Sequence, residues 1–195
     1  RLLHVLWPAL SGRDELPDYE YIYLSRRTAH AALAAEGLTR ERALVGLYNP
    51  SQQGLYSILR VYALPPEAFE ELAHEHGFEE IREPLKDWKD PRLERFLADP
   101  RVQARIREYG GVQRDLMERY LEGVGFFGDG AVALVDIGWN GTIQSVLEQT
   151  YGAREDFPEL FGLYFGFVAG IPHPFGPANH VEGLVYDERR RIASE

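Results

Sequence analysis

The stretch VALVDIGWNGTIQSVLEQ, residues 132–149, decides the fold of this chain. It begins with apolar residues typical of a buried strand, which run into Asp136. A glycine-containing turn follows, and the segment that begins at Thr142 has the apolar spacing of an amphipathic helix. Strand, polar turn and helix in this order make up half of a βαβ unit. The stretch therefore predicts an α/β protein built on a parallel sheet.

Three other apolar runs predict further strands. EYIYLSRR (20–27) is a β-type run that ends at Ser25, and TAHAALAAEG (28–37) then has the pattern of a helix. The expected strands cover residues 20–25, 131–136, 161–168 and 181–186. We expect one α/β domain over residues 1–195, with a mostly parallel sheet, flanking helices and a helical insertion at 39–124. Within that insertion, Gly110-Gly111 predicts a kink or a break.

Composition excludes several classes of protein. A formal net charge of -10 argues against broad binding to nucleic acid. The chain has no cysteine, and no apolar run approaches the roughly 20 residues of a transmembrane helix. These features fit a cytoplasmic protein. The apolar residues 2–6 have no capping residue before them, so we interpret the chain as part of a longer protein.

Polar clusters follow two of the expected strands, LSRR (24–27) and VDIGWNGT (135–142). In open α/β sheets, ligands bind at the carboxyl ends of the strands. Glycines let backbone N–H groups turn toward one point, and the following helix adds its positive end, so a phosphate fits there. Asp136 is placed to bind sugar hydroxyls or a divalent cation. The pattern predicts a sugar-phosphate site, although strand, glycine turn and helix also occur in α/β folds for structural reasons alone.

The second cluster resembles the phosphoribosyltransferase signature. That signature has a hydrophobic strand, an acidic pair, three variable residues, Thr-Gly, a variable residue and Thr. ALVD supplies the strand and one acid, IGW the spacer, and Asn140-Gly141 stands where Thr-Gly would be. Thr142 and Ile143 complete the loop. Val135 replaces the first acid, Asn140 replaces Thr, and Ile143 replaces the last Thr, so Ile143 offers only its backbone N–H.

A resemblance covers more of the chain. YIYLSRRTA (21–29), followed after a long helical stretch by VALVDIGWNGTIQ (132–144), resembles bacterial polysaccharide-biosynthesis proteins labelled haloacid-dehalogenase-like. In several of these, a phosphoribosyltransferase-like module accompanies a phosphatase module. Phosphoribosyl pyrophosphate donates a phosphoribosyl group to a glycan, and the phosphatase removes the 5-phosphate. The resemblance implies a Rossmann-like three-layer fold, a glycan or lipid-linked saccharide acceptor, and a phosphatase module in the same longer chain.

The resemblance also implies roles for individual residues. Asp136 would bind the ribose hydroxyls and stabilise positive charge at the anomeric carbon, while Arg26 or Arg27 would bind pyrophosphate. Mg²⁺ would bridge pyrophosphate and ribose. Trp139 would either stack on the acceptor sugar or fill a gap between helix and sheet. The implied substrate-binding residues are Ser25, Arg26, Arg27, Gly138, Trp139, Asn140, Gly141, Thr142 and Ile143, with Asp136 as the catalytic residue.

Two other functions remain open at this point. A haloacid-dehalogenase phosphatase uses a strand-end Ser and a later strand-end Asp, which Ser25 and Asp136 could imitate. It also needs Asp-x-Asp, which occurs nowhere in the 195 residues. A non-catalytic interaction module of a polysaccharide-biosynthesis complex is the second alternative. Among the histidines, His173 or His180 could act as a general base from the loop PHPFGPANH (172–180).

Overall fold

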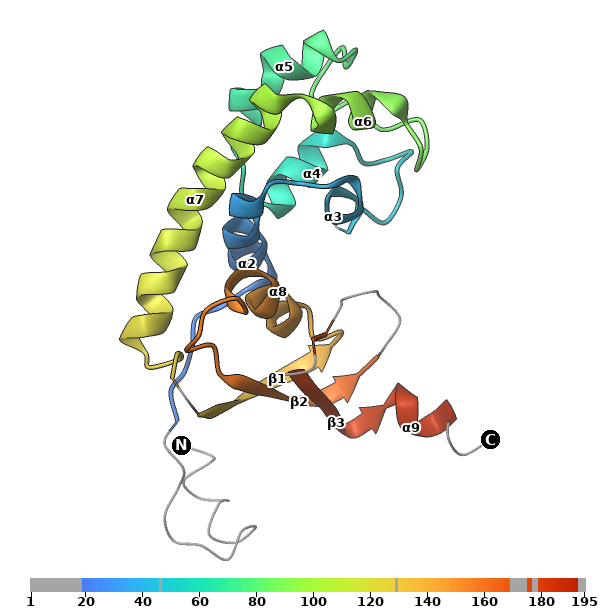
Figure 1. Ribbon diagram of the computed structural model, residues 1–195. Helices are drawn as coiled ribbons and strands as arrows, with labels where there is room; N and C mark the ends of the chain where they lie inside the picture. Colours follow the sequence, from blue (N-terminus) through green and yellow to red (C-terminus); the bar gives the residue numbers. More distant parts are fainter. Residues whose placement is uncertain (1–18, 46, 129, 169–174, 177–178, 193–195) are drawn as a thin grey trace, which may run out of the picture.

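The computed structural model describes residues 19–45, 47–128, 130–168, 175–176 and 179–192. The helices are α2 (Arg26–Leu33), α3 (Arg40–Leu44), α4 (Leu55–Val61), α5 (Glu70–Glu75), α6 (Pro91–Ala98), α7 (Pro100–Gly123), α8 (Thr142–Tyr151) and α9 (Glu188–Ile192), with 3-10 turns η1 (Ala34–Glu36) and η2 (Pro66–Phe69). Figure 1 shows α8 directly over a small sheet, α2 above α8, and the remaining helices α3 to α6 farther from the sheet, with the long α7 alongside.

The sheet has three parallel strands in the order β1-β2-β3. The strands are β1 (Ala131–Trp139), β2 (Glu159–Phe167) and β3 (Asn179–Asp187). They confirm the strands expected at 131–136, 161–168 and 181–186, and α8 confirms the helix after the quoted turn. The parallel α/β architecture is therefore the one that the alternation of apolar strands and amphipathic helix predicts.

The prediction that residues 20–25 form a strand of the sheet was wrong. These residues are extended, but they join no ladder among the described residues. Their anchors are of another kind: the Tyr23 N–H donates to the Tyr120 hydroxyl at 2.8 Å, and Leu24 packs against the apolar cluster between α7, α8 and the sheet. The β-type residues correctly predicted extended backbone, but pairing depends on the partner strand, which local sequence does not encode.

Helix α7 is unbroken where a kink was expected. It begins after Asp99, whose carboxylate accepts the Arg101 N–H at 2.8 Å, and it continues through Gly110. A Cβ built on Gly110 would lie 2.3 Å from the backbone nitrogen of Ala35. The glycine therefore serves close packing of α7 against the turn after α2 rather than a bend.

The apolar core lies in separate clusters. One fills the helical region between α3, α4, α5, α6 and α7, and another joins α7 and α8 to the sheet. A third consists of Ala29 and Leu33 of α2 and Val146 of α8. This contact packs α2 against α8 (Figure 1). In the sequence, LSRR lies at the start of α2 and VDIGWNGT at the start of α8.

Helices cover one face of the sheet in the described part of the chain. On β1, Val132 and Leu134 face α8 and belong to the core, whereas Val135 and Ile137 are 78% and 77% exposed. The second helical layer of a three-layer fold is thus not among the described elements. None of the described helices is long and apolar enough to cross a membrane.

Candidate functional site

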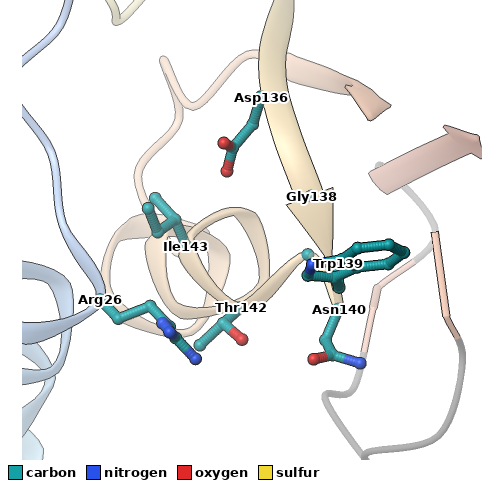
Figure 2. Close-up of a pocket in the computed structure, with 8 residues that line it drawn as sticks. Arg26, Asp136, Gly138, Trp139, Asn140, Thr142 and Ile143 are labelled. Carbon is teal, nitrogen blue, oxygen red and sulfur yellow. The ribbon is translucent and has the colours of Figure 1, made fainter. Parts of the chain in front are cut away.

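A pocket of about 240 Å³ lies where β1 ends and α8 begins (Figure 2). Its lining comes from two segments that are far apart in the sequence, the start of α2 and the β1–α8 junction. The lining residues are Arg26, Asp136, Gly138, Trp139, Asn140, Gly141, Thr142 and Ile143. Every one of them belongs to the set that the sequence singled out. Ser25 and Arg27, also in that set, do not line the pocket.

The turn before α8 is shorter than the sequence suggested. β1 continues through Gly138 and Trp139, so only Asn140 and Gly141 separate it from α8. Gly141 is the N-cap residue, with φ 65° and ψ 23°, and its carbonyl accepts the Ser145 N–H at 3.0 Å. This left-handed conformation favours glycine, and a Cβ there would also lie 2.6 Å from the Phe175 ring. Glycine is therefore required at this point of the loop.

The start of α8 has the properties of an anion site. The first N–H groups of any helix have no partner within the helix, and the helix dipole places positive charge there. α8 has no acidic residue in its first turn to neutralise that charge. Ile143, in this turn, lines the pocket. A phosphate group in the pocket would meet backbone donors and a favourable field.

Asn140 holds the loop through its side chain. Its Nδ2 donates to the Val168 carbonyl at 2.9 Å, and the Val168 N–H donates to the Trp139 carbonyl at 2.9 Å. The loop after β1 is thereby tied to the end of β2. Asn140 stands where the phosphoribosyltransferase signature has Thr, and its amide has a structural role of its own at that position.

Asp136 lies within β1, three positions before the strand ends at Trp139. Its register partner on β2 is Tyr164, and the two face the helices. Tyr164 donates its hydroxyl to Gln144 Oε1 at 3.0 Å. Burial, with a further contribution from the negative charge of Asp136, raises the pKa of Tyr164 far above its usual range. The phenol therefore remains a hydrogen-bond donor beside the carboxylate.

Gln144 and Tyr164 are site-supporting residues that the sequence analysis missed. Gln144 is fully buried on α8, and its Nε2 donates to Asn179 Oδ1 at 2.7 Å and to the His180 carbonyl at 3.0 Å. These bonds fix the first turn of α8 to β3, and the Tyr164 hydroxyl fixes it to β2. The available signal was a long polar side chain on the sheet-facing side of α8, where apolar residues predominate.

Arg26 brings a cation to the pocket from the first position of α2. Ser25 caps this helix: the Thr28 N–H donates to Ser25 Oγ at 3.1 Å, and the Ser25 N–H donates to Thr28 Oγ1 at 3.0 Å. Figure 2 shows the Arg26 side chain pointing toward Thr142, at the start of α8. No described carboxylate forms an ion pair with Arg26. Its guanidinium is therefore available to a ligand anion.

Trp139 lies at the rim of the pocket and is 57% exposed. Its ring rests on the backbone of β2, because a Cβ built on Gly166 would lie 2.9 Å from Trp139 Cζ3. Figure 2 shows the indole directed away from Arg26 and Asp136. The ring is thus not enclosed between helix and sheet, and much of its surface is open to a ligand at the rim.

The histidines do not join the pocket in the described structure. His173 lies outside the described residues. His180 belongs to β3 rather than to the preceding loop, its ring stacks on Phe161 at 4.5 Å, and its Nε2 lies 2.7 Å from Glu159 Oε1. Glu159 begins β2, so this pair lies at the end of the sheet opposite the pocket. The placement of His180 in a loop beside the site was wrong.

The described residues contain no group of three or more His, Cys, Asp or Glu side chains that could hold a metal by themselves. Mg²⁺ usually keeps several waters and binds one or two carboxylates together with substrate phosphates. Asp136 at the pocket is a donor of that kind. The residues present fit a Mg²⁺ ion that arrives with a phosphorylated ligand rather than one held by a protein cage.

A scan against protein-family models finds no match for this chain, and a search of curated proteins finds none. The functional argument therefore rests on the geometry and chemistry of the pocket.

Proposed function

We propose that this domain is a phosphoribosyltransferase-type glycosyltransferase of polysaccharide biosynthesis. It would take phosphoribosyl pyrophosphate as donor and a glycan or lipid-linked saccharide as acceptor. The observation that carries the proposal is the meeting of three ligand-binding elements in one pocket: the start of α8, the Asp136 carboxylate and the Arg26 guanidinium. The proposal places the domain in the cytoplasm, with a phosphatase module in the same longer chain.

Each element has a role toward the donor. The first turn of α8 holds the 5-phosphate through backbone N–H groups. Asp136 accepts hydrogen bonds from ribose hydroxyls, and Arg26 donates to the pyrophosphate as a planar fork. When bound, Mg²⁺ neutralises charge on the leaving pyrophosphate.

The reaction breaks the bond between the anomeric carbon and a pyrophosphate oxygen. An acceptor hydroxyl oxygen forms the new bond to that carbon, and its proton passes to water. Positive charge develops on the ribose ring as pyrophosphate leaves, as in other glycosyl transfers. Asp136 stabilises this charge electrostatically.

The size of the pocket limits what it holds. Its volume of about 240 Å³ is below the roughly 300–1,000 Å³ of sites for drug-sized ligands. A phosphorylated pentose is small enough for it, and an oligosaccharide is not. The acceptor therefore stays outside the pocket, where the exposed Trp139 ring offers an apolar face to a sugar.

Calorimetric titration tests the proposal. The ligands are phosphoribosyl pyrophosphate with Mg²⁺, ribose 5-phosphate, and a nucleoside diphosphate sugar as comparator. We expect the first two to bind, and Gly141→Val to abolish both because it disrupts the N-cap of α8. The matched control is Gly111→Val, since a Cβ at Gly111 meets nothing within 4 Å.

The outcomes separate the alternatives. Binding that survives Gly141→Val, or binding of the nucleoside diphosphate sugar alone, contradicts the proposed site. Release of inorganic phosphate from ribose 5-phosphate would favour the haloacid-dehalogenase-type phosphatase, although the Ser25 hydroxyl is engaged in capping α2. Binding of none of the ligands would favour the non-catalytic interaction module.

A further inference from the structure

A buried amide lies within the apolar contact between α8 and the sheet. Gln144 is fully buried, one turn before Leu147 and two turns before Tyr151, which belong to the apolar cluster between α7, α8 and the sheet. Residues three and four positions apart share one face of a helix. An apolar residue at position 144 would therefore continue this cluster, and the presence of an amide there needs a separate explanation.

Each polar atom of this amide has a partner. Its Nε2 donates to Asn179 Oδ1 at 2.7 Å and to the His180 carbonyl at 3.0 Å, both on β3. Its Oε1 accepts the Tyr164 hydroxyl of β2 at 3.0 Å. The sheet also leaves space for the amide, because a Cβ built on Gly162 would lie 2.0 Å from Gln144 Oε1. These three bonds fix the orientation of the amide against both strands.

Stability alone is a poor explanation for such a network. Buried polar partners that are replaced together by apolar groups of similar shape often leave a protein equally stable or more stable. A network in which every member is bonded instead specifies one arrangement of the elements that it joins. Here the network joins the first turn of α8 to β2 and β3.

The turn that is held in this way lies at the pocket. Thr142 and Ile143 line the pocket, and Gln144 is the next residue of the same turn (Figure 2). A helix has no internal acceptors for the N–H groups of its first residues, and Gly141, the N-cap, has no side chain that could accept them. These N–H groups bind a phosphate only when they point toward it. A shift of α8 on the sheet would therefore change the affinity for phosphate.

We infer that Gln144 is a positioning residue of the phosphate site, and that its side chain orients the first turn of α8 without touching the ligand. This role rests on the proposed function, in which a phosphate lies at that turn. Asn179 and Tyr164 act on the site through Gln144. β3 thus contributes to phosphate binding, although none of its residues is among those that line the pocket.

A double variant separates positioning from stability. Gln144→Met together with Tyr164→Phe removes the network and leaves apolar side chains of similar size. The urea midpoint of this variant should lie above that of Tyr164→Phe alone, in which Gln144 Oε1 has lost its donor. Its affinity for ribose 5-phosphate, measured by calorimetric titration, should fall about tenfold, a typical effect of a residue that acts without contacting the ligand. Gln149→Met, farther along α8, is the matched control and should bind as the original chain does.

Two further measurements show which group of the ligand is affected. Ribose 5-phosphate and phosphoribosyl pyrophosphate share the 5-phosphate, so the double variant should lose affinity for both by the same factor. A general loosening of the pocket would weaken phosphoribosyl pyrophosphate more, because that ligand also contacts Arg26. In ¹H–¹⁵N spectra, ribose 5-phosphate should shift the amide resonances of Ile143 and Gln144 in the original chain, and the shift of the Ile143 amide should be smaller in the double variant.

The outcomes distinguish this role from the proposed function itself. Equal affinity of the double variant and the original chain, or a larger loss for phosphoribosyl pyrophosphate, would overturn the positioning role alone. If the original chain bound neither ligand, the proposed function would fail together with it. Should the double variant not fold, Asn179→Ala removes one acceptor from Gln144 at a partly exposed position. It should lower the affinity for both ligands by one common factor, and unchanged affinity would contradict the role of Gln144.

Discussion

Tyr164 lies beside Asp136 across β1 and β2, and its hydroxyl donates to Gln144 in the first turn of α8. The carboxylate of the pocket and the residue that anchors α8 are thus neighbours on one face of the sheet. The pairing of β1 with β2 places Asp136 beside Tyr164, and the hydrogen bond of the buried Tyr164 hydroxyl joins β2 to α8. Several expected outcomes depend on this arrangement.

Replacing Asp136 should weaken ligand binding without unfolding the protein. Asp136→Asn removes a charged acceptor, and hydrogen bonds to charged groups contribute roughly 1.5–3 kcal/mol, or about 10- to 100-fold in affinity. Calorimetric titration with phosphoribosyl pyrophosphate and Mg²⁺ measures the change. Asp115→Asn, an exposed acid on α7, is the control and should have no effect. Equal affinity of both variants would remove Asp136 from the site.

The two adjacent arginines should differ in their effect. Arg26 lines the pocket and Arg27 does not. Arg26→Ala should lower affinity for phosphoribosyl pyrophosphate by about tenfold or more, because it removes a charge-assisted bond. Its effect on ribose 5-phosphate should be smaller, since that ligand has no pyrophosphate. Titration of Arg27→Ala with the same ligands provides the matched comparison, and a larger loss there would reverse the assignment.

Tyr164→Phe should destabilise the domain. It leaves the buried Gln144 Oε1 without its phenol donor, and an unsatisfied buried polar group costs about 1–3 kcal/mol in unfolding free energy. Urea denaturation followed by circular dichroism gives this value. Tyr48→Phe, at an 83% exposed position, should leave the midpoint unchanged. A midpoint equally unchanged in Tyr164→Phe would show that the buried bond is unimportant.

The glycine pair of α7 should respond in opposite directions. Gly110→Ala places a methyl group 2.3 Å from the Ala35 nitrogen and should cost about 1–3 kcal/mol by overpacking. Gly111→Ala meets nothing within 4 Å and should stabilise α7 by roughly 0.5–1 kcal/mol, the difference in helix propensity. Thermal unfolding of the two variants gives the signs. Destabilisation by both would indicate a bend that requires glycine.

Asp90 should make stability depend on pH in the acid range. Its buried carboxylate accepts from the Arg92 side chain, foremost, and from the Lys86 N–H at 2.8 Å, which holds its pKa well below the usual range. Because the pKa of Asp90 is lower in the folded than in the unfolded chain, its ionised carboxylate stabilises the folded state. This stabilisation is complete above the unfolded pKa of about 3.9 and is lost as the pH falls below that value. The urea midpoint of the original chain should exceed that of Asp90→Asn at neutral pH, and the difference between the two proteins should shrink at low pH. A constant difference would contradict this.

The sequence predicted the lining of the pocket more accurately than the limits of the sheet. The glycines, Asp136 and the apolar spacing after Thr142 act locally, so they predicted β1, α8 and most of the pocket lining. The end of β1 was misplaced because Gly138 resembles a turn residue, whereas it serves close packing: a Cβ there would lie 2.1 Å from the Gly166 carbonyl oxygen. Residues 20–25 were misassigned because pairing is a tertiary property.

The contact of Gly110 with Ala35 has a consequence for ligand binding. It attaches α7, and with it the helical region, to the end of the segment that begins with Arg26. Asp136 and α8 belong to the sheet. A ligand held between Arg26 and α8 would therefore add a contact to the packing that already connects the helical region to the sheet, and its binding free energy would stabilise the two against unfolding separately.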